Sequence, residues 1–115
     1  MTGAMKGRVT SGFERLLTRA RGLAATGRAE EAKSAYLEAL RQDPASGPAL
    51  GELAALAYES DNRAAARTLY KQMVQSHPKN ATGWINLGTI LFEDGELFAA
   101  RSALEAALRD RKSVV

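Results

Sequence analysis

The sequence predicts an all-α protein built from three antiparallel helix hairpins. The first observation is a spacing of 34 residues: Pro44 and Pro78 stand that far apart, and each follows a polar pair that closes an apolar helical pattern. The second is that apolar residues recur at helical spacing between these points. The third is a set of small residues in one register, which two helices need where they cross closely. Together they indicate one structural unit that occurs three times.

Equivalent positions of the three units hold residues of the same kind. In steps of 34 they are Ala20, Ala54 and Gly88; Leu23, Ala57 and Leu91; Gly27, Asp61 and Gly95; Ala32, Ala66 and Ala100; and Tyr36, Tyr70 and Leu104. We expect the small residues at the crossing inside each hairpin. The glycines and the aspartate are expected at the turns, because these residues tolerate a left-handed backbone. The tyrosines are expected to fill the space between neighbouring hairpins.

Six helices and three segments follow from this register. The first helices of the units are expected over residues 13–26, 48–60 and 82–94, and the second helices over residues 29–42, 63–76 and 97–110. Prolines close the first two units, because proline cannot continue a helix. The expected segments are a flexible N-terminal segment (1–12), a repeat domain (13–112, divided into 13–46, 47–80 and 81–112) and a C-terminal tail (113–115).

The third unit resembles the tetratricopeptide repeat. The residues that carry the resemblance are Trp84, Leu87, Gly88, Leu91, Gly95, Leu97, Ala100, Leu104 and Ala107. The first two units match in their small residues, tyrosines and prolines, whereas Arg19, Arg63, Met73 and Lys112 depart from the pattern. The resemblance covers about residues 13–112. It implies a right-handed α-solenoid whose first helices line a concave, ligand-binding face.

A partner-binding surface is expected on that face, formed by first-helix residues that point away from the hairpin core. The candidates are Leu17, Arg21, Glu52, Tyr58, Ile85, Asn86, Thr89 and Phe92. They combine an apolar strip with polar anchors, although Tyr58 and Phe92 are also candidates for packing between repeats. Some relatives clamp acidic C-terminal tails with Lys, Asn and Arg side chains. Here only Arg21 and Asn86 resemble such a clamp, and Glu52 and Glu59 oppose a carboxylate, so an apolar or mildly basic peptide fits better.

The last helix offers a second candidate surface. Solenoids usually need a polar capping helix after the final repeat, and Leu97, Leu104 and Leu108 belong to a helix that no further repeat follows in this sequence. We expect a partner chain, a second copy or a further segment to cover these residues. Alternatively, the aliphatic stems of Arg101, Glu105 and Arg109 shield them.

The composition argues against several kinds of chemistry. Cysteine is absent and His77 is the only histidine, so a disulfide, a thiolate metal site and a Ser–His–acid constellation find no support. No glycine-rich phosphate loop occurs, and we expect no enzyme activity, cofactor or metal. No apolar run approaches the ~20 residues of a membrane helix, and no secretory signal is recognisable, so we expect a cytoplasmic protein or a piece of a longer one. The net charge of +3 is too small to favour nucleic acid.

The function predicted is therefore that of a non-catalytic protein–protein interaction scaffold that binds a peptide or partner protein on its concave face. Two alternatives remain open. One is a structural subunit that self-associates through its last hairpin. The other is the targeting domain of a larger enzyme or secretion complex. A nucleic-acid role, which is not expected, would use Arg15, Arg19, Arg21 and Arg28.

Overall fold

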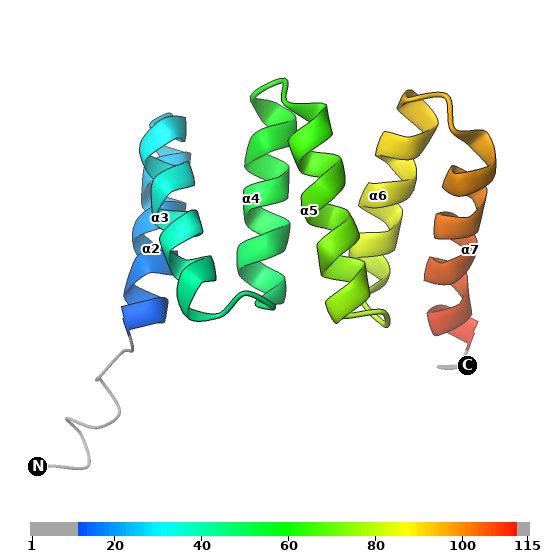
Figure 1. Cartoon of the computed structure of the whole chain (residues 1–115), viewed down its shortest axis with the longest axis horizontal. Coiled ribbons are helices and arrows are strands. Elements are labelled where there is room, and N and C mark those ends of the chain that lie inside the picture. Colours follow the sequence, from blue (N-terminus) through cyan, green and yellow to red (C-terminus); the bar gives the residue numbers. More distant parts are fainter. Residues whose placement is uncertain (1–11, 113–115) are drawn as a thin grey trace, which may run out of the picture. The chain divides into compact units, whose positions relative to one another are not determined.

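The computed structural model of the chain describes residues 12–112, and these residues form six α-helices and no strand (Figure 1). The helices are α2 (Gly12–Ala25), α3 (Ala29–Gln42), α4 (Gly47–Glu59), α5 (Arg63–Ser76), α6 (Ala81–Glu93) and α7 (Leu97–Lys112). The predicted all-α helical-repeat class is confirmed, and the expected helix ends agree to within one or two residues. The expected N-terminal segment lies outside the described residues except for Gly12, which begins α2, and the C-terminal tail lies wholly outside them.

The chain divides into two compact units, one ending at Pro44 and the other beginning at Ala45. Among the described residues, the first unit holds the hairpin of α2 and α3. The second unit holds the hairpins α4–α5 and α6–α7, whose helices run alternately up and down (Figure 1). In the first hairpin Ala20 and Ala32 are fully buried, as expected of small residues at a helix crossing.

The turns inside the hairpins have the backbone conformation that the sequence predicts. Gly27, Asp61 and Gly95 all have positive φ angles, of 82°, 64° and 81° respectively. Asp61 is the one residue among them with a side chain, and aspartate is among the few residues that adopt this conformation at modest cost. The turn position of the repeat thus has a left-handed backbone conformation in all three hairpins.

Side-chain caps begin α4, α5 and α6 of the second unit. Ser46 accepts a hydrogen bond from the backbone N–H of Ala49 at 3.2 Å and so caps α4. Asn62 does the same for α5, and Asn80 for α6, where its Oδ1 lies 2.9 Å from the N–H of Gly83. Each cap satisfies a donor that the first turn of a helix cannot pair internally.

Helices α6 and α7 approach each other closely at Gly88, on α6. A Cβ atom at this position would lie 3.0 Å from the side chain of Leu104 and 3.4 Å from the carbonyl oxygen of Ala100, both on α7. The predicted crossing of Gly88 with Ala100 is therefore confirmed. Ala54 and Ala66 are fully buried at the equivalent positions of the preceding hairpin.

The two hairpins of the second unit stack through α5 and α6. A Cβ atom at Gly83 would lie 3.1 Å from Val74 and 3.4 Å from Met73, so glycine lets α6 lie directly on α5. Tyr70 and Val74, which occupy this side of α5, are almost completely buried. Tyr70 thus lies between neighbouring hairpins as predicted.

Candidate partner-binding surface

The candidate surface is formed by the first helices of the two hairpins in the second unit, and we call it the α4–α6 face. Its members recur at helical spacing: Gly51, Ala55 and Tyr58 on α4, and Ile85, Thr89 and Phe92 on α6. Each residue of the first set has its partner in the second set 34 positions later. Glycine and alanine on α4 are therefore the repeat equivalents of the larger isoleucine and threonine on α6.

A small pocket of about 90 Å³ joins α4, α5 and α6 at this face. Its walls are Tyr58, Tyr70, Asn86, Thr89 and Ile90. Three of the predicted partner-binding residues, Tyr58, Asn86 and Thr89, are therefore brought together by the fold. The pocket offers aromatic and aliphatic walls with one amide and three hydroxyl groups, a mixture that suits an apolar side chain next to a hydrogen-bonding backbone.

Two further predicted residues are apolar and open to solvent on α6. Ile85 is 45% exposed and Phe92 is 65% exposed. A side chain such as Phe92 gains little from this position in the isolated chain, because most of its apolar surface remains in water. Exposed aromatic residues beside a pocket are typical of sites that dominate protein–protein binding energy.

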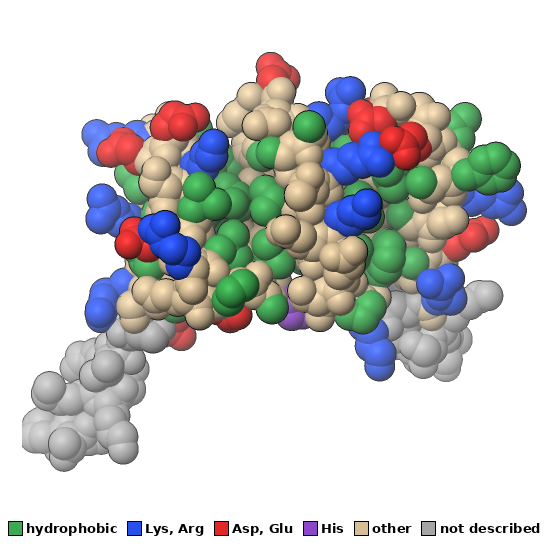
Figure 2. Space-filling model, in the orientation of Figure 1, with side chains coloured by type: hydrophobic (Ala, Val, Ile, Leu, Met, Phe, Trp, Pro, Cys, Tyr) green, Lys and Arg blue, Asp and Glu red, His purple; other side chains and the backbone are tan. Residues whose placement is uncertain are grey.

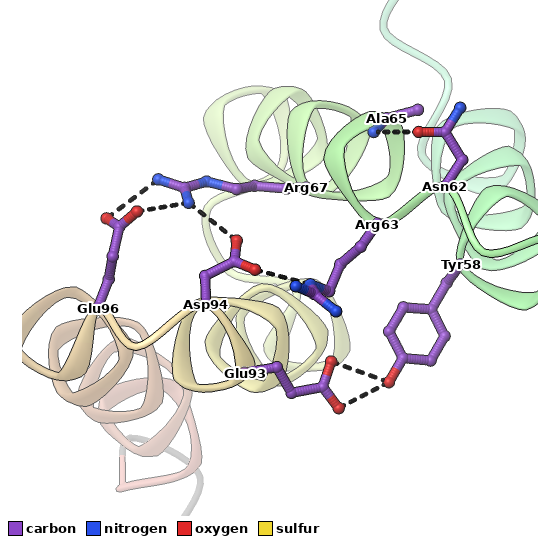
Figure 3. A network of polar contacts seen from close by, with 8 residues as sticks. All are labelled: Tyr58, Asn62, Arg63, Ala65, Arg67, Glu93, Asp94 and Glu96. Atoms are coloured by element: carbon purple, nitrogen blue, oxygen red, sulfur yellow. Dashed lines mark hydrogen bonds and ion pairs between the residues drawn. The ribbon is translucent and has the colours of Figure 1, made fainter.

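A polar network at the turn end of the face connects the two hairpins (Figure 3). The Tyr58 hydroxyl lies 2.8 and 3.0 Å from the two carboxylate oxygens of Glu93, to which it donates. On the neighbouring side, Arg63 Nε lies 2.6 Å from Asp94 Oδ1. Arg67 bonds Asp94 at 3.0 Å and forms a bidentate pair with Glu96 at 2.6 and 3.1 Å.

The network fixes the protonation of its members. Hydrogen bonds from Arg63 and Arg67 lower the pKa of Asp94, and the bond from Arg67 lowers the pKa of Glu96. The bond to Glu93 raises the pKa of Tyr58, because ionised tyrosine could not donate to a carboxylate. At neutral pH Asp94 and Glu96 are thus charged and Tyr58 is neutral, and the Tyr58 ring is held at the wall of the pocket.

The remaining predicted residues of this site are not part of the α4–α6 pocket. Leu17 is buried, so its placement on an exposed binding strip is wrong. It precedes the fully buried Ala20 by one helical turn, and residues at that spacing share a face of the helix. Arg21 is exposed on α2, in the other compact unit, and Glu52 is half-buried on α4.

The Arg63–Asp94–Arg67–Glu96 network was not predicted. A signal was present, because Arg63 and Arg67 lie in the first turns of α5, whereas Asp94 and Glu96 flank Gly95 in the turn between α6 and α7. Pairing them requires knowing that the turn of the third hairpin lies beside the start of α5, which follows from stacking and not from helical periodicity. The role of Tyr70 as a pocket wall was also missed.

The second predicted surface, on α7, is exposed. Leu97, Leu104 and Leu108 all reach solvent, and Figure 2 shows hydrophobic side chains at the surface along the α7 end of this unit. Leu104 is 41% exposed, whereas Tyr70, the equivalent residue of α5, is 6% exposed. Leu108 is 57% exposed and its equivalent Val74 is 3% exposed. The alternative, in which Arg101, Glu105 and Arg109 shield the leucines, is not supported, because Leu104 and Leu108 remain exposed. Arg101 and Glu105 pair with each other at 3.2 Å.

An open groove of about 520 Å³ runs between α6 and α7. Trp84, Leu87 and Leu91 line it from α6, and Ala103 and Ala106 form part of its floor on α7. The indole N–H of Trp84 donates to the carbonyl of Pro78 at 2.7 Å, so the ring is held in place. Alanine at position 103 leaves space where the equivalent residue of α5 is Leu69.

In residues 12–112 no group of three or more metal-ligating side chains comes together. None of the helices there is long and apolar enough to cross a membrane. The Nε2 atom of His77 lies 2.5 Å from the carbonyl oxygen of Ala45, so this histidine is engaged in holding the loop before α4.

Comparison with known families identifies the repeat. A profile described as Tetratricopeptide repeat matches residues 52–113, which is more than half of the chain. The chain therefore belongs to the tetratricopeptide repeat family. No curated protein matches it in sequence.

Solved structures share the fold at low sequence identity. The second tetratricopeptide domain of Spaghetti (RPAP3), bound to the HSP90 peptide SRMEEVD, has a TM-score of 0.76 and 19% identity, covering 84% of this chain and 89% of that one. The Sgt2 tetratricopeptide domain from Aspergillus fumigatus has a TM-score of 0.79 and 22% identity, covering 90% of this chain and 68% of that one. The Yersinia enterocolitica type III secretion translocator chaperone SycD, in an alternative dimer, has a TM-score of 0.78 and 20% identity. The match covers 89% of this chain and 77% of SycD.

Proposed function

We propose that this chain is a non-catalytic interaction module that holds a segment of a partner protein on the α4–α6 face. The observation that carries the proposal is the pocket between Tyr58 and Asn86, with Ile85 and Phe92 exposed on the same helix as Asn86. A bound segment would remove this apolar surface from water, at roughly 25 cal/mol for each Å² buried. One structural neighbour holds a peptide, SRMEEVD, which supports a binding role for a related fold.

The surface is preorganised for such a role. Tyr58 is held by Glu93, and Tyr70 is fixed by burial between α5 and α6. Side chains that are already ordered lose little conformational freedom when a partner binds, and this lowers the entropic cost of association. Tyr58, which is held in place yet remains 40% exposed, can therefore contribute to affinity at low entropic cost.

The test is a selection of displayed random peptides on the immobilised chain, followed by fluorescence polarisation with the selected peptides. We expect Phe92→Ala to weaken binding by about tenfold or more, because a buried aromatic anchor contributes roughly 2 kcal/mol. The matched control is Phe98→Ala, which removes an even more exposed phenylalanine from α7. Equal affinities of the two variants for every selected peptide would rule out the α4–α6 face.

A second function is favoured by the exposed leucines of α7. We propose that Leu104 and Leu108 form a contact with another copy of the chain, because the equivalent face of α5 is covered by a helix. SycD, a structural neighbour, is described as a dimer. Light scattering over a range of concentrations should give a mass approaching twice the 12.3 kDa monomer.

Leu108→Glu should return that mass to the monomer value, because a buried carboxylate would be unpaired. Leu37→Glu, a change at an exposed leucine of α3, is the control and should leave the mass unchanged. A wild-type chain that stays monomeric at every concentration would contradict self-association.

A further inference from the structure

Charge is sorted by helix in the second unit. The first helices, α4 and α6, contain no Lys or Arg, and their charged residues are Glu52, Glu59 and Glu93. The second helix between them, α5, contains Arg63, Arg67 and Lys71 and no acid. The surface that carries the pocket is thus anionic, and the cations lie on α5, where Figure 2 shows them gathered beside acidic side chains.

Arg63 and Arg67 of α5 form their hydrogen bonds with acids that follow α6, although the charge of Arg63 also interacts with Glu93. Arg63 and Arg67 are engaged with Asp94 and Glu96, at distances of 2.6 to 3.1 Å. Glu93 accepts its hydrogen bonds from the neutral hydroxyl of Tyr58. Figure 3 shows the Glu93 carboxylate turned toward Tyr58 and away from the Arg67 pairs.

Glu59 and Glu93 mark equivalent ends of the face. Each is the last residue of its helix, and the two helices run in the same direction (Figure 1). The C-terminal end of a helix carries a partial negative charge from its unpaired carbonyls, which adds to the two carboxylates. Burial raises the pKa of Tyr70, and the nearby Glu59 charge raises it further, so this charge is felt at the pocket wall.

We infer that the segment held on the α4–α6 face is cationic. Its apolar side chains contact Ile85, Phe92 and the pocket, and its Lys or Arg side chains lie against Glu59 and Glu93. The inference rests on the proposed binding function and adds the charge of the ligand to it. It also separates this chain from its structural neighbour, whose peptide SRMEEVD is predominantly acidic.

The experiment uses the peptides selected from the random library on the intact chain, together with the acidic peptide SRMEEVD as a second probe. We expect peptides that depend on Phe92 to be enriched in Lys and Arg, and SRMEEVD to show no measurable binding. The double variant Glu59→Gln/Glu93→Gln should weaken the selected peptides by about fivefold, which is the effect of two exposed charge pairs. Glutamine at 93 can still accept the Tyr58 hydrogen bond, so the pocket wall is kept.

Glu105→Gln, on α7, is the matched control and should leave affinity unchanged. Affinity should also fall as salt is raised, because the pairs are exposed to solvent. The charge inference would be wrong if peptides whose affinity depends on Phe92 carried no excess of Lys and Arg, or bound the Glu59→Gln/Glu93→Gln variant as tightly as the wild type. The proposed binding function would then still stand. Peptides that are all indifferent to Phe92 would overturn the binding function, and the charge inference with it.

Discussion

The outward faces of α5 and α7 are built alike and end up in opposite environments. Tyr70 and Val74 of α5 are covered by α6, whereas Leu104 and Leu108, 34 positions later on α7, are exposed. Helical periodicity assigns all four residues to the same side of their helices. The difference teaches that burial at these positions is decided by the neighbouring helix, and that the repeat pattern alone indicates only which side is available for packing.

The covered face also has polar support that the exposed one lacks in the described structure. Arg63 and Arg67 reach from α5 to acids at the end of α6, so the stacked hairpins are joined by ionic as well as apolar contacts. On α7, Arg101 pairs with Glu105 of its own helix and joins no second element through that pair. Three predictions test this comparison.

The largest effect is expected from truncating the covered face. Tyr70→Ala should lower the free energy of unfolding by about 3 kcal/mol, because it opens a cavity between α5 and α6. The equivalent change on the exposed face, Leu104→Ala, should cost about 1 kcal/mol, since much of that side chain is already in water. Urea unfolding followed by Trp84 fluorescence measures both. Equal costs would mean that α7 is covered in solution.

A smaller effect is expected at the crossing of α6 and α7. Gly88→Leu should destabilise the chain by about 1–3 kcal/mol, because even a Cβ atom there would press on Leu104. Gly22→Ala is the control, since no atom lies near a Cβ at that helical position, and it should stabilise α2 by roughly 0.5–1 kcal/mol. Thermal unfolding followed by circular dichroism distinguishes them. A Gly88→Leu chain that melts like the wild type would contradict the close approach.

The smallest effect concerns the ionic contacts between the hairpins. The folded pKa values of Asp94 and Glu96 lie below their ordinary values of 3.8 and 4.5, so their contribution to stability is complete above about pH 4.5. It is lost as pH falls through the lowered folded values. The melting temperature of the wild type should therefore fall more steeply on acidification than that of Asp94→Asn/Glu96→Gln.

Glu105→Gln should keep the wild-type pH dependence, because Glu105 pairs within α7 and joins no hairpins. If the melting temperature fell equally with pH in the wild type and in the Asp94→Asn/Glu96→Gln variant, the network would not contribute to holding α5 against α6.

Much of the candidate surface follows from periodicity. The spacing assigned Tyr58, Ile85, Asn86, Thr89 and Phe92 to the first helices, and three of these line one pocket. Their use by a partner stays a prediction. Leu17 was misplaced because periodicity gives the angle of a residue around its helix but not where the packed surface ends. A leucine at the border of a face can be buried or exposed with the same spacing.

The sequence by itself determined the local features of this protein. It indicated the six helices, the left-handed turn positions at Gly27, Asp61 and Gly95, and a small residue at Gly88, because each depends on residues close along the chain or at a fixed repeat spacing. Tertiary structure alone decided that Arg63 meets Asp94, that Tyr70 becomes a pocket wall, and that Leu104 is left in solvent. These outcomes depend on which helix lies next to which, and contacts between residues distant in sequence follow from packing that no local pattern specifies.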